Sequence, residues 1–336
     1  MHRYLILLIS VFFLGALISA RAQQPDERDQ PRLRGDLEVL LEVQHRADEN
    51  YWAFEYPLYG NLGVLYEGEE LEAALSVDLI EEVSIGETYI RGGRDYSYLK
   101  LGYYTETWRT GYSWSVVDIL NDRDERYPNH VFYRNILRPN PMATMSFGGK
   151  GWAQQIIASQ KQESERVEDT LLGVRSLLFR TGFESGFGVI RYAGYPPPLI
   201  FLTVKSESER TIAWGEVGWW VYMGAPDTVN GVIGVRQSFT STFVVAEFIV
   251  QGSDLLLFLE EQSQINRYIA FDVQSYLYFN QFSTAFKAYV STTLGERALV
   301  ELGTILFFGE EGTYFSRYNI FEDNNNQIYL RLAYSY

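Results

Sequence analysis

The sequence predicts an all-β fold, namely a transmembrane antiparallel β-barrel of about 16–18 strands that follows an N-terminal signal peptide. Three observations predict it. Segments of about 9–13 residues alternate between apolar and polar side chains from Asp36 to Tyr336, and a tilted strand needs this length to cross a bilayer. Tyrosine and tryptophan gather at the ends of such segments, for example at Tyr103, Tyr104 and Trp108, where barrels carry aromatic girdles. The last segment alternates up to a terminal aromatic residue.

The composition narrows the classes of function. The chain has 336 residues, of which 43 are acidic and 28 basic, so its formal net charge is -15. Because an acidic chain lacks the basic face on which phosphates bind, we expect no nucleic-acid partner. Cysteine is absent and only 3 histidines occur, which excludes thiolate metal sites and leaves little for imidazole sites. We therefore expect no cofactor and no metal site.

Residues 1–22 predict a secretory signal peptide. A basic start is followed by an apolar run over residues 4–18, and the small residues of Ala20-Arg21-Ala22 form a cleavage pattern. A retained membrane anchor is the alternative, although the run is short for a spanning helix. Residues 23–35 are polar and contain two prolines, which favours a flexible periplasmic lead-in. The barrel is then expected over residues 36–336, in the bacterial outer membrane.

The strands alternate with period two. Between Ala298 and Phe308, the side chains of Val300 and Leu302 share one face and Glu301 lies on the other. A soluble β-sandwich alternates as well, so the strand lengths and the aromatic girdles decide for the membrane barrel. With both ends on the periplasmic side, the strand count is expected to be even. A barrel of this size encloses a lumen too wide for wall side chains to fill.

Charged residues within the strands are the candidates for the lumen wall. A charge that faces lipid at mid-bilayer costs ~2–4 kcal/mol, so these side chains are expected to face water or each other. They either line a pore, with basic and acidic rows opposed, or tie neighbouring strands together by cross-strand pairs. The wall candidates are Lys100, Glu106, Arg175, Arg191, Glu216, Arg236, Glu247, Asp272, Glu301 and Arg331.

A long loop over residues 108–140 is the most informative irregular segment. Its apolar residues Trp114, Val116 and Leu120 need something to pack against, which favours a loop that folds into the lumen and narrows it. A surface cap is the alternative. The loop candidates for a constriction are Arg109, Asp118, Asp122 and Arg123.

The C-terminal strand predicts an assembly signal. Bacterial outer-membrane barrels end in this alternating pattern with a terminal aromatic residue, and the resemblance implies recognition by the barrel-insertion machinery. The residues that carry this signal are Leu330, Leu332, Tyr334 and Tyr336.

The stretch from Glu87 to Asn121 carries a further pattern, a strand and turn followed by L-x-x-G, a tryptophan, a glycine and a D-x-x-N end. It resembles a segment of Gram-negative outer-membrane porin-like proteins, the alginate-export-like and related uncharacterised barrels. The resemblance implies a barrel of about 16–18 strands and passive export or uptake. The matching positions are Leu99, Gly102, Trp108, Gly111, Asp118 and Asn121.

The predicted function is a porin-like channel for passive diffusion of small hydrophilic solutes or ions. The partners expected are outer-membrane lipid, the insertion machinery and those solutes, and no strand face indicates an oligomer interface. Two alternatives remain, a structural or adhesive barrel with a closed lumen and a barrel hydrolase. For the hydrolase, His130 lies near Asp122 and Asp124 but without a serine motif beside it, so we predict no catalytic residues and no enzyme activity.

Overall fold

The computed structural model describes residues 32–46, 51–55, 58–79, 83–117, 119–123, 132, 137–160, 166–194, 197–222, 228–295, 297–309, 315 and 326–335. The predicted signal peptide, Asp118 and Tyr336 lie outside the described residues.

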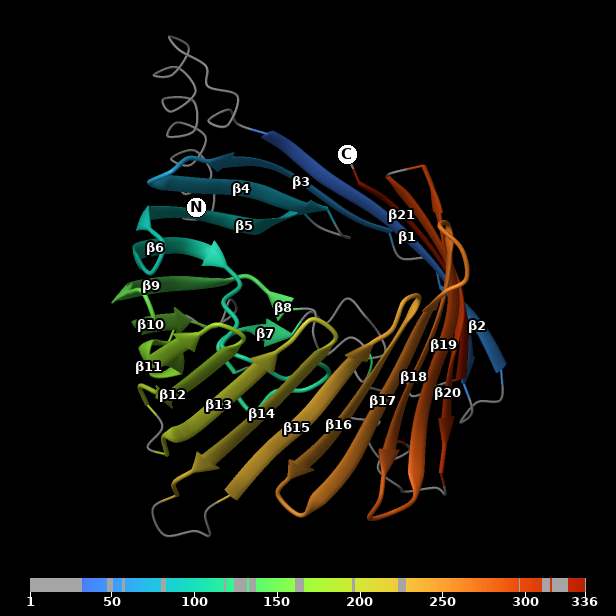
Figure 1. The fold of residues 1–336 in the computed structure, drawn as a ribbon. Helices are drawn as coiled ribbons and strands as arrows, with labels where there is room; N and C mark the ends of the chain where they lie inside the picture. Colours follow the sequence, from blue (N-terminus) through green and yellow to red (C-terminus); the bar gives the residue numbers. More distant parts are fainter. Residues whose placement is uncertain are drawn as a thin grey trace.

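The described residues form β-strands and a single 3-10 turn, Val167–Asp169. Figure 1 shows the strands following one another around a curved wall, with β7 and β8 in the space that the wall encloses. The strands are β1 (Arg32–Arg46), β2 (Tyr51–Glu55), β3 (Leu58–Glu67), β4 (Leu71–Leu79), β5 (Val83–Arg94), β6 (Ser97–Tyr104), β7 (Asp122–Arg123), β8 (Leu137–Arg138), β9 (Asn140–Gly149), β10 (Trp152–Gln160), β11 (Thr170–Arg180), β12 (Phe183–Tyr192), β13 (Leu199–Glu207), β14 (Thr211–Trp220), β15 (Thr228–Ser238), β16 (Thr242–Gln251), β17 (Asp254–Gln264), β18 (Ile269–Tyr278), β19 (Ser283–Leu294), β20 (Ala298–Phe308) and β21 (Asn326–Ser335).

The wall is a closed antiparallel ring. From β3 to β6 and from β9 to β21 each strand pairs with the next along the chain, and β6 pairs with β9. The strand β1 closes the ring by pairing with β21 on one side, as at Leu37 with Tyr334, and with β3 on the other, as at Leu37 with Gly60. The sheet has 19 strands, but β2 and β3 lie one after the other along β1 and share one place. The ring therefore has 18 places, which confirms the predicted all-β barrel and its even strand count.

One boundary differs from the predicted one. The first strand begins at Arg32, where it pairs with Leu65, rather than at Asp36, so residues 32–35 belong to the wall and not to the lead-in. Among the described residues, no helix is long and apolar enough to span a membrane.

The two faces of the wall differ in chemistry. In β16, Val244 and Phe248 are exposed, whereas Val245 and Glu247 are buried. Because successive strand residues point to opposite faces, this alternation separates an exposed apolar face from a buried mixed face. In a closed ring, the exposed apolar face is the outer one and the buried face lines the interior. Buried side chains on the inner face require a segment that covers them.

The two ends of the ring also differ. Short turns such as Asp95-Tyr96 and Thr181-Gly182 join strands at one end, which we call the short-turn end. At the opposite end, which we call the loop end, the chain leaves the wall after Tyr104 and returns to it in β9 at Asn140.

Candidate functional site

The candidate site is the barrel interior, and it is organised by residues 105–121, which we call the inward segment. The side chain of Asn121 ties the two ends of this segment together. Its Oδ1 accepts a hydrogen bond from the Glu106 N–H at 3.0 Å, and its Nδ2 donates one to the Glu106 carbonyl oxygen at 2.7 Å. The segment is thus a closed loop, and it lies against the inner wall.

Glu216, on the inner face of β14, holds one side of the inward segment. Its carboxylate accepts hydrogen bonds from the backbone N–H groups of Thr110, Gly111 at 2.8 Å and Val116 at 2.9 Å. The hydroxyls of Thr110, at 3.1 Å, and Ser115, at 2.6 Å, donate to the same carboxylate. Glu216 is 1% exposed, so these donors replace water as the partners of a buried charge.

Glu247, on β16, holds the adjoining turn. Its carboxylate accepts hydrogen bonds from the N–H groups of Tyr112 at 2.6 Å and Ser113 at 2.7 Å, and from the Ser113 hydroxyl. The indole N–H of Trp214, on β14, donates to it at 2.6 Å. Two wall carboxylates therefore accept hydrogen bonds from the backbone of the inward segment. We call Glu216 and Glu247 the clamp.

Apolar packing completes the seat of the inward segment. The Trp108 ring centroid lies 5.8 Å from that of Phe201, and the Arg175 guanidinium carbon lies 4.9 Å from the Trp108 ring. Two wall glycines make this approach possible. A Cβ at Gly218 would lie 2.0 Å from Cγ1 of Val116, and one at Gly173 would lie 2.8 Å from the Trp108 ring. The wall is therefore shaped to receive this segment.

The resulting apolar cluster covers a large part of the inner wall. It joins residues of the inward segment to inner-face residues of strands between β9 and β19, and it extends to Tyr89 of β5 and Tyr104 of β6. We call the part between β9 and β19 the packed wall. The buried members include Trp108, Trp114, Val116, Val117, Leu120, Met142, Ile157, Leu171, Ile190, Leu199, Phe201, Val232, Val245, Ile249, Leu256, Phe258, Tyr276, Tyr278 and Ala285.

Several predicted wall charges also lie on the inner face. The Lys100 ammonium lies 3.8 Å from the ring centroid of Tyr89 and 4.2 Å from that of Tyr104. Arg175 donates from Nε to Oε1 of Gln155 at 2.6 Å.

A second group of inner charges lies on β15 to β21. The Arg236 guanidinium carbon lies 4.1 Å from the Phe243 ring centroid. Asp272 is buried, and Glu301 accepts a hydrogen bond from the Tyr329 hydroxyl at 2.6 Å and pairs with Arg331 at 3.6 Å. The contacts of Arg236 and Glu301 join neighbouring strands, and the pore-lining role of these residues stays a prediction.

Two wall assignments need correction. Arg191 shares the exposed outer face of β12 with Phe187 and Val189. It is the next-to-last residue of the strand, where a charge near the interface costs only ~0–1 kcal/mol, so the mid-bilayer argument does not apply to it. Glu106 is not in the wall, because β6 ends at Tyr104 and Glu106 belongs to the inward segment.

The loop candidates are only partly described. Arg109 is partly buried within the inward segment, and Asp118 lies outside the described residues. Asp122 and Arg123 form β7, whose backbone pairs with Arg138 and Leu137 of β8. The structure does not describe the side chains of Asp122 and Arg123.

The interior shifts the acidity of two groups in the inward segment. Burial raises the pKa of the Glu106 carboxyl above its ordinary value, against the opposing effect of Arg175, Lys100 and Arg91. Burial and the neighbouring Glu260 raise the pKa of the Tyr112 hydroxyl. Both groups are thus biased toward their protonated forms when the segment is seated.

A cavity of about 380 Å³ lies on the part of the inner wall formed by β3, β4 and β5. It is lined by the acidic residues Glu67, Glu72, Asp78 and Glu87, together with Thr105 of the inward segment. We call this region the acid wall. None of these carboxylates was a sequence candidate. The alternation of polar and apolar residues over 58–94 indicated that these carboxylates share one face of their strands. Only the strand register shows that they lie next to one another.

Most of the residues that carried the family resemblance belong to the site. Trp108 and Gly111 lie in the inward segment, and Asn121 closes it. Gly102 has φ +139, where a Cβ would lie 2.2 Å from the Thr88 carbonyl oxygen, so this position favours glycine. Leu99 is exposed on the outer face of β6. The residues of the family pattern therefore lie mainly where the chain leaves β6 and enters the inward segment.

The predicted assembly signal lies in β21. Leu332 and Tyr334 are exposed on the outer face, Leu330 has the same parity and is partly buried, and Tyr336 lies outside the described residues. The signal role of these residues stays a prediction.

Comparison with family models and with curated proteins finds no match. Comparison with solved structures finds porins. A mutant porin of Rh. blastica has a TM-score of 0.59 at 8% identity and covers 91% of this chain and 100% of that chain. OccAB4 of Acinetobacter baumannii has a TM-score of 0.63 at 7% identity over 93% of this chain and 100% of its own. OpdO of Pseudomonas aeruginosa has a TM-score of 0.62 at 10% identity over 91% and 96%.

The fold is therefore that of a porin-like β-barrel, as the sequence predicted. At these identities, the likeness concerns the fold and leaves the activity to be argued from the site.

Proposed function

We propose that the chain is an outer-membrane channel for passive diffusion of small hydrophilic solutes or ions, and not an enzyme. The observation that carries the proposal is the clamp, by which a closed, apolar-coated barrel holds a loop inside its own interior. A buried loop fixed by two carboxylates is a means of setting the cross-section of a channel. The charged inner face and the cavity beside the loop support a polar path past it.

The route of the chain to the membrane belongs to the same proposal. The apolar outer face fits the hydrocarbon of an outer membrane, with lipid as its first partner. Residues 1–22 would direct export across the inner membrane and be removed. The C-terminal strand would then be read by the insertion machinery.

The apolar cluster on the packed wall favours a second candidate, the structural barrel with a closed lumen. The same contacts that narrow a channel can close it when the loop fills the whole cross-section. The two candidates differ in conduction alone.

Single-channel recording of the refolded mature protein in a planar bilayer under a salt gradient separates them. The channel predicts stable open steps with a measurable reversal potential. A barrel that folds, as judged by its heat-modifiable migration in gels, and yet never conducts would overturn the channel and leave the closed barrel.

A further inference from the structure

We infer that the rim of the barrel at the short-turn end binds a glycerophospholipid whose headgroup carries both a phosphate and an ammonium group. The inference rests on the proposed outer-membrane channel, and it assigns a particular lipid to a particular place on the barrel. It is carried by a cavity between three turns, by two cations that pair with no described residue, and by the apolar surface next to them.

A cavity of about 690 Å³ lies between three hairpin turns at the short-turn end. This volume is within the range of about 300–1,000 Å³ that is usual for ligand pockets. The turns are those between β5 and β6, between β9 and β10, and between β11 and β12. We call this cavity the rim pocket, and it is lined by residues 94–97, 148–151 and 179–181.

Contacts between the three turns hold the rim pocket in shape. The Ser97 hydroxyl donates a hydrogen bond to the Gly148 carbonyl oxygen at 3.3 Å, which joins the first turn to the second. The Phe179 N–H donates to the Gly151 carbonyl oxygen at 2.9 Å, which joins the second turn to the third. The Tyr96 ring stacks on the Phe179 ring, with their centroids 5.0 Å apart. The pocket is therefore preformed, and part of its lining is aromatic.

Two exposed cations of the rim pocket, Lys150 and Arg180, are available to a phosphate. Each lies one residue along the chain from the hydrogen bond between Phe179 and Gly151, so the two side chains start from neighbouring positions on adjacent turns. Within the part of the chain that the structure describes, neither side chain forms an ion pair. An ammonium and a guanidinium at neighbouring positions are suited to hold one phosphate by charge-assisted hydrogen bonds.

Arg94 is the third cation of the rim pocket, and the fold already uses its charge. It pairs with Glu70 at 2.7 Å and with Glu69 at 3.3 Å. Glu184 of β12 does not compensate Arg180 in the same way, because Glu184 has the parity of the inner face and Arg180 that of the outer face. The positive charge that is open to a ligand is therefore that of the two exposed cations.

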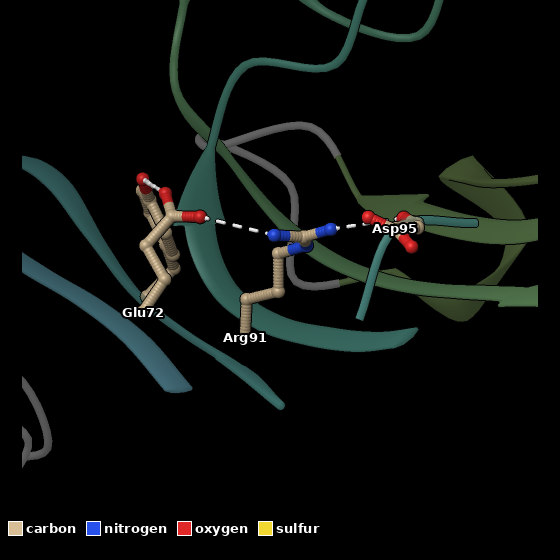
Figure 2. Close-up of polar contacts among 4 residues, drawn as sticks. Glu72, Arg91 and Asp95 are labelled. Carbon is tan, nitrogen blue, oxygen red and sulfur yellow. Dashed lines mark hydrogen bonds and ion pairs between the residues drawn. The ribbon is translucent and has the colours of Figure 1, made fainter. Parts of the chain in front are cut away.

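Asp95 adds an acidic group on the first turn. Figure 2 shows Arg91 between Glu72 and Asp95. Arg91 pairs with Oε2 of Glu72 at 3.3 Å, and its Nη2 donates to the backbone carbonyl oxygen of Asp95 at 3.1 Å. The Asp95 carboxylate itself forms no ion pair with a described residue. Two open cations and one open carboxylate match a headgroup that carries a phosphate and an ammonium group.

The outer face next to the rim pocket is apolar and aromatic. Trp152 and Phe147 are exposed there, and their rings meet edge to face with centroids 6.5 Å apart. Leu178 lies directly across from Trp152 and is also exposed. It precedes Arg180 by two residues on the same face of β11. A lipid whose phosphate lies on the cations can therefore lay an acyl chain over these side chains, with the tryptophan at headgroup level.

The position of the rim pocket also fits this class of lipid. Outer-membrane barrels keep their short turns on the periplasmic side, where the leaflet consists of glycerophospholipids. The strands β5, β9 and β11 all end at the turns of the pocket, so the pocket lies where the wall leaves the hydrocarbon. A headgroup is the part of a lipid that occupies this level.

The test compares two double variants that lose the same charge at the same end of the barrel. The pocket variant, Lys150→Gln/Arg180→Gln, removes both expected phosphate contacts. The control, Arg210→Gln/Arg267→Gln, changes two exposed arginines in other turns of the short-turn end, those between β13 and β14 and between β17 and β18. Both proteins are checked for folding by heat-modifiable migration in gels.

The first readout is the dissociation constant of the first bound lipid. The full mature chain in detergent is titrated with phosphatidylethanolamine and followed by native mass spectrometry. We expect discrete binding of one lipid to the wild type and to the control, and binding about three- to tenfold weaker in the pocket variant. Absence of discrete binding to the wild type, or equal weakening in the two variants, overturns the inference.

The second readout tests the ammonium contact. Asparagine tolerates the φ of 44° at position 95, so Asp95→Asn keeps the turn and removes only the charge. We expect this variant to bind phosphatidylethanolamine about two- to threefold more weakly and phosphatidylglycerol no more weakly than the wild type does. An equal change for both lipids overturns the assigned headgroup.

These measurements do not need conduction, so the two proposals fail separately. If the wild type binds the lipid as expected but never conducts, the proposed channel fails and the lipid site holds. If it conducts but shows no discrete lipid binding, the channel holds and the lipid site fails.

Discussion

The carboxylates of the clamp and those of the acid wall differ in their hydrogen-bond partners. On the packed wall, the Glu247 carboxylate accepts bonds from Tyr112, Ser113 and Trp214, and Glu216 is similarly surrounded. On the acid wall, the described partners of the Asp78 carboxylate amount to one amide, that of Asn61. The clamp carboxylates therefore accept more hydrogen bonds among the described residues than the Asp78 carboxylate does.

The difference also has an energetic side. A saturated carboxylate fixes a backbone, because removing it leaves several buried N–H groups without an acceptor. The Glu87 carboxylate of the acid wall accepts from a single residue of the inward segment, Thr105, so its removal leaves fewer N–H groups without an acceptor. Substitutions in the clamp and in its seat are expected to differ in the size of their effects.

The largest effect is expected from Glu247→Ala. The substitution leaves the N–H groups of Tyr112 and Ser113 and the indole of Trp214 without their acceptor, at about 1–3 kcal/mol each. If the free energy that holds the inward segment against the wall falls by about 3 kcal/mol, the hydrogen-exchange protection of residues 110–116 falls roughly 100-fold. The exposed Glu261→Ala is the control. Equal protection in the two variants would show that the clamp does not hold the segment.

A somewhat smaller effect is expected from Gly218→Ala. Its new Cβ would lie 2.0 Å from Cγ1 of Val116, so the segment must shift, at a cost of about 1–3 kcal/mol. The matched control is Gly215→Ala on the outer face of the same strand, where the closest atom to a Cβ is 3.5 Å away. Thermal unfolding of the two variants checks this, and a midpoint as high for Gly218→Ala as for Gly215→Ala would contradict the packing.

The smallest effect is a pH dependence through Glu106. Because burial raises the pKa of this carboxyl, the seated segment binds the proton more tightly than a displaced segment does. Its contribution is therefore fully present at low pH and is lost as pH rises through the raised pKa, from about pH 4 upward. The positive charges of Arg175, Lys100 and Arg91 oppose the shift.

The pH profile of tryptophan fluorescence, which reports the seating of Trp108 and Trp114, measures this effect. Glu106→Gln is expected to flatten the profile, since the amide does not titrate. An unchanged profile in this variant would assign the titration to another group.

Much of the architecture is readable from the sequence because a strand in a barrel repeats one simple rule. Alternation placed Glu216, Glu247 and Asp272 opposite the apolar face, and the structure has them on the inner wall. Apolar residues in a long loop, such as Trp114 and Val116, indicated a loop that packs against something. The structure places both of these residues in the buried cluster on the inner wall.

Other features depend on facts that alternation does not contain. Alternation continues past Tyr104 into Glu106, but pairing with the neighbouring strand stops at Tyr104, and only the register shows this. The acid wall brings together Glu67, Glu72 and Glu87 from three strands. A bulge between Leu75 and Val77 of β4 sets the position of Glu87 relative to β4. A one-residue slip would send any of them to the outer face.

The pairing of β1 with β21 has a consequence for how the chain is made. The first and last strands are hydrogen-bonded neighbours, with Leu37 opposite Tyr334. A nascent or truncated chain that lacks β21 therefore exposes two unpaired strand edges, and such edges template association with other chains. The wall becomes self-contained only once β21 has been made and paired with β1, so closure is a long-range event and the interval before it is when the chain is most prone to aggregate.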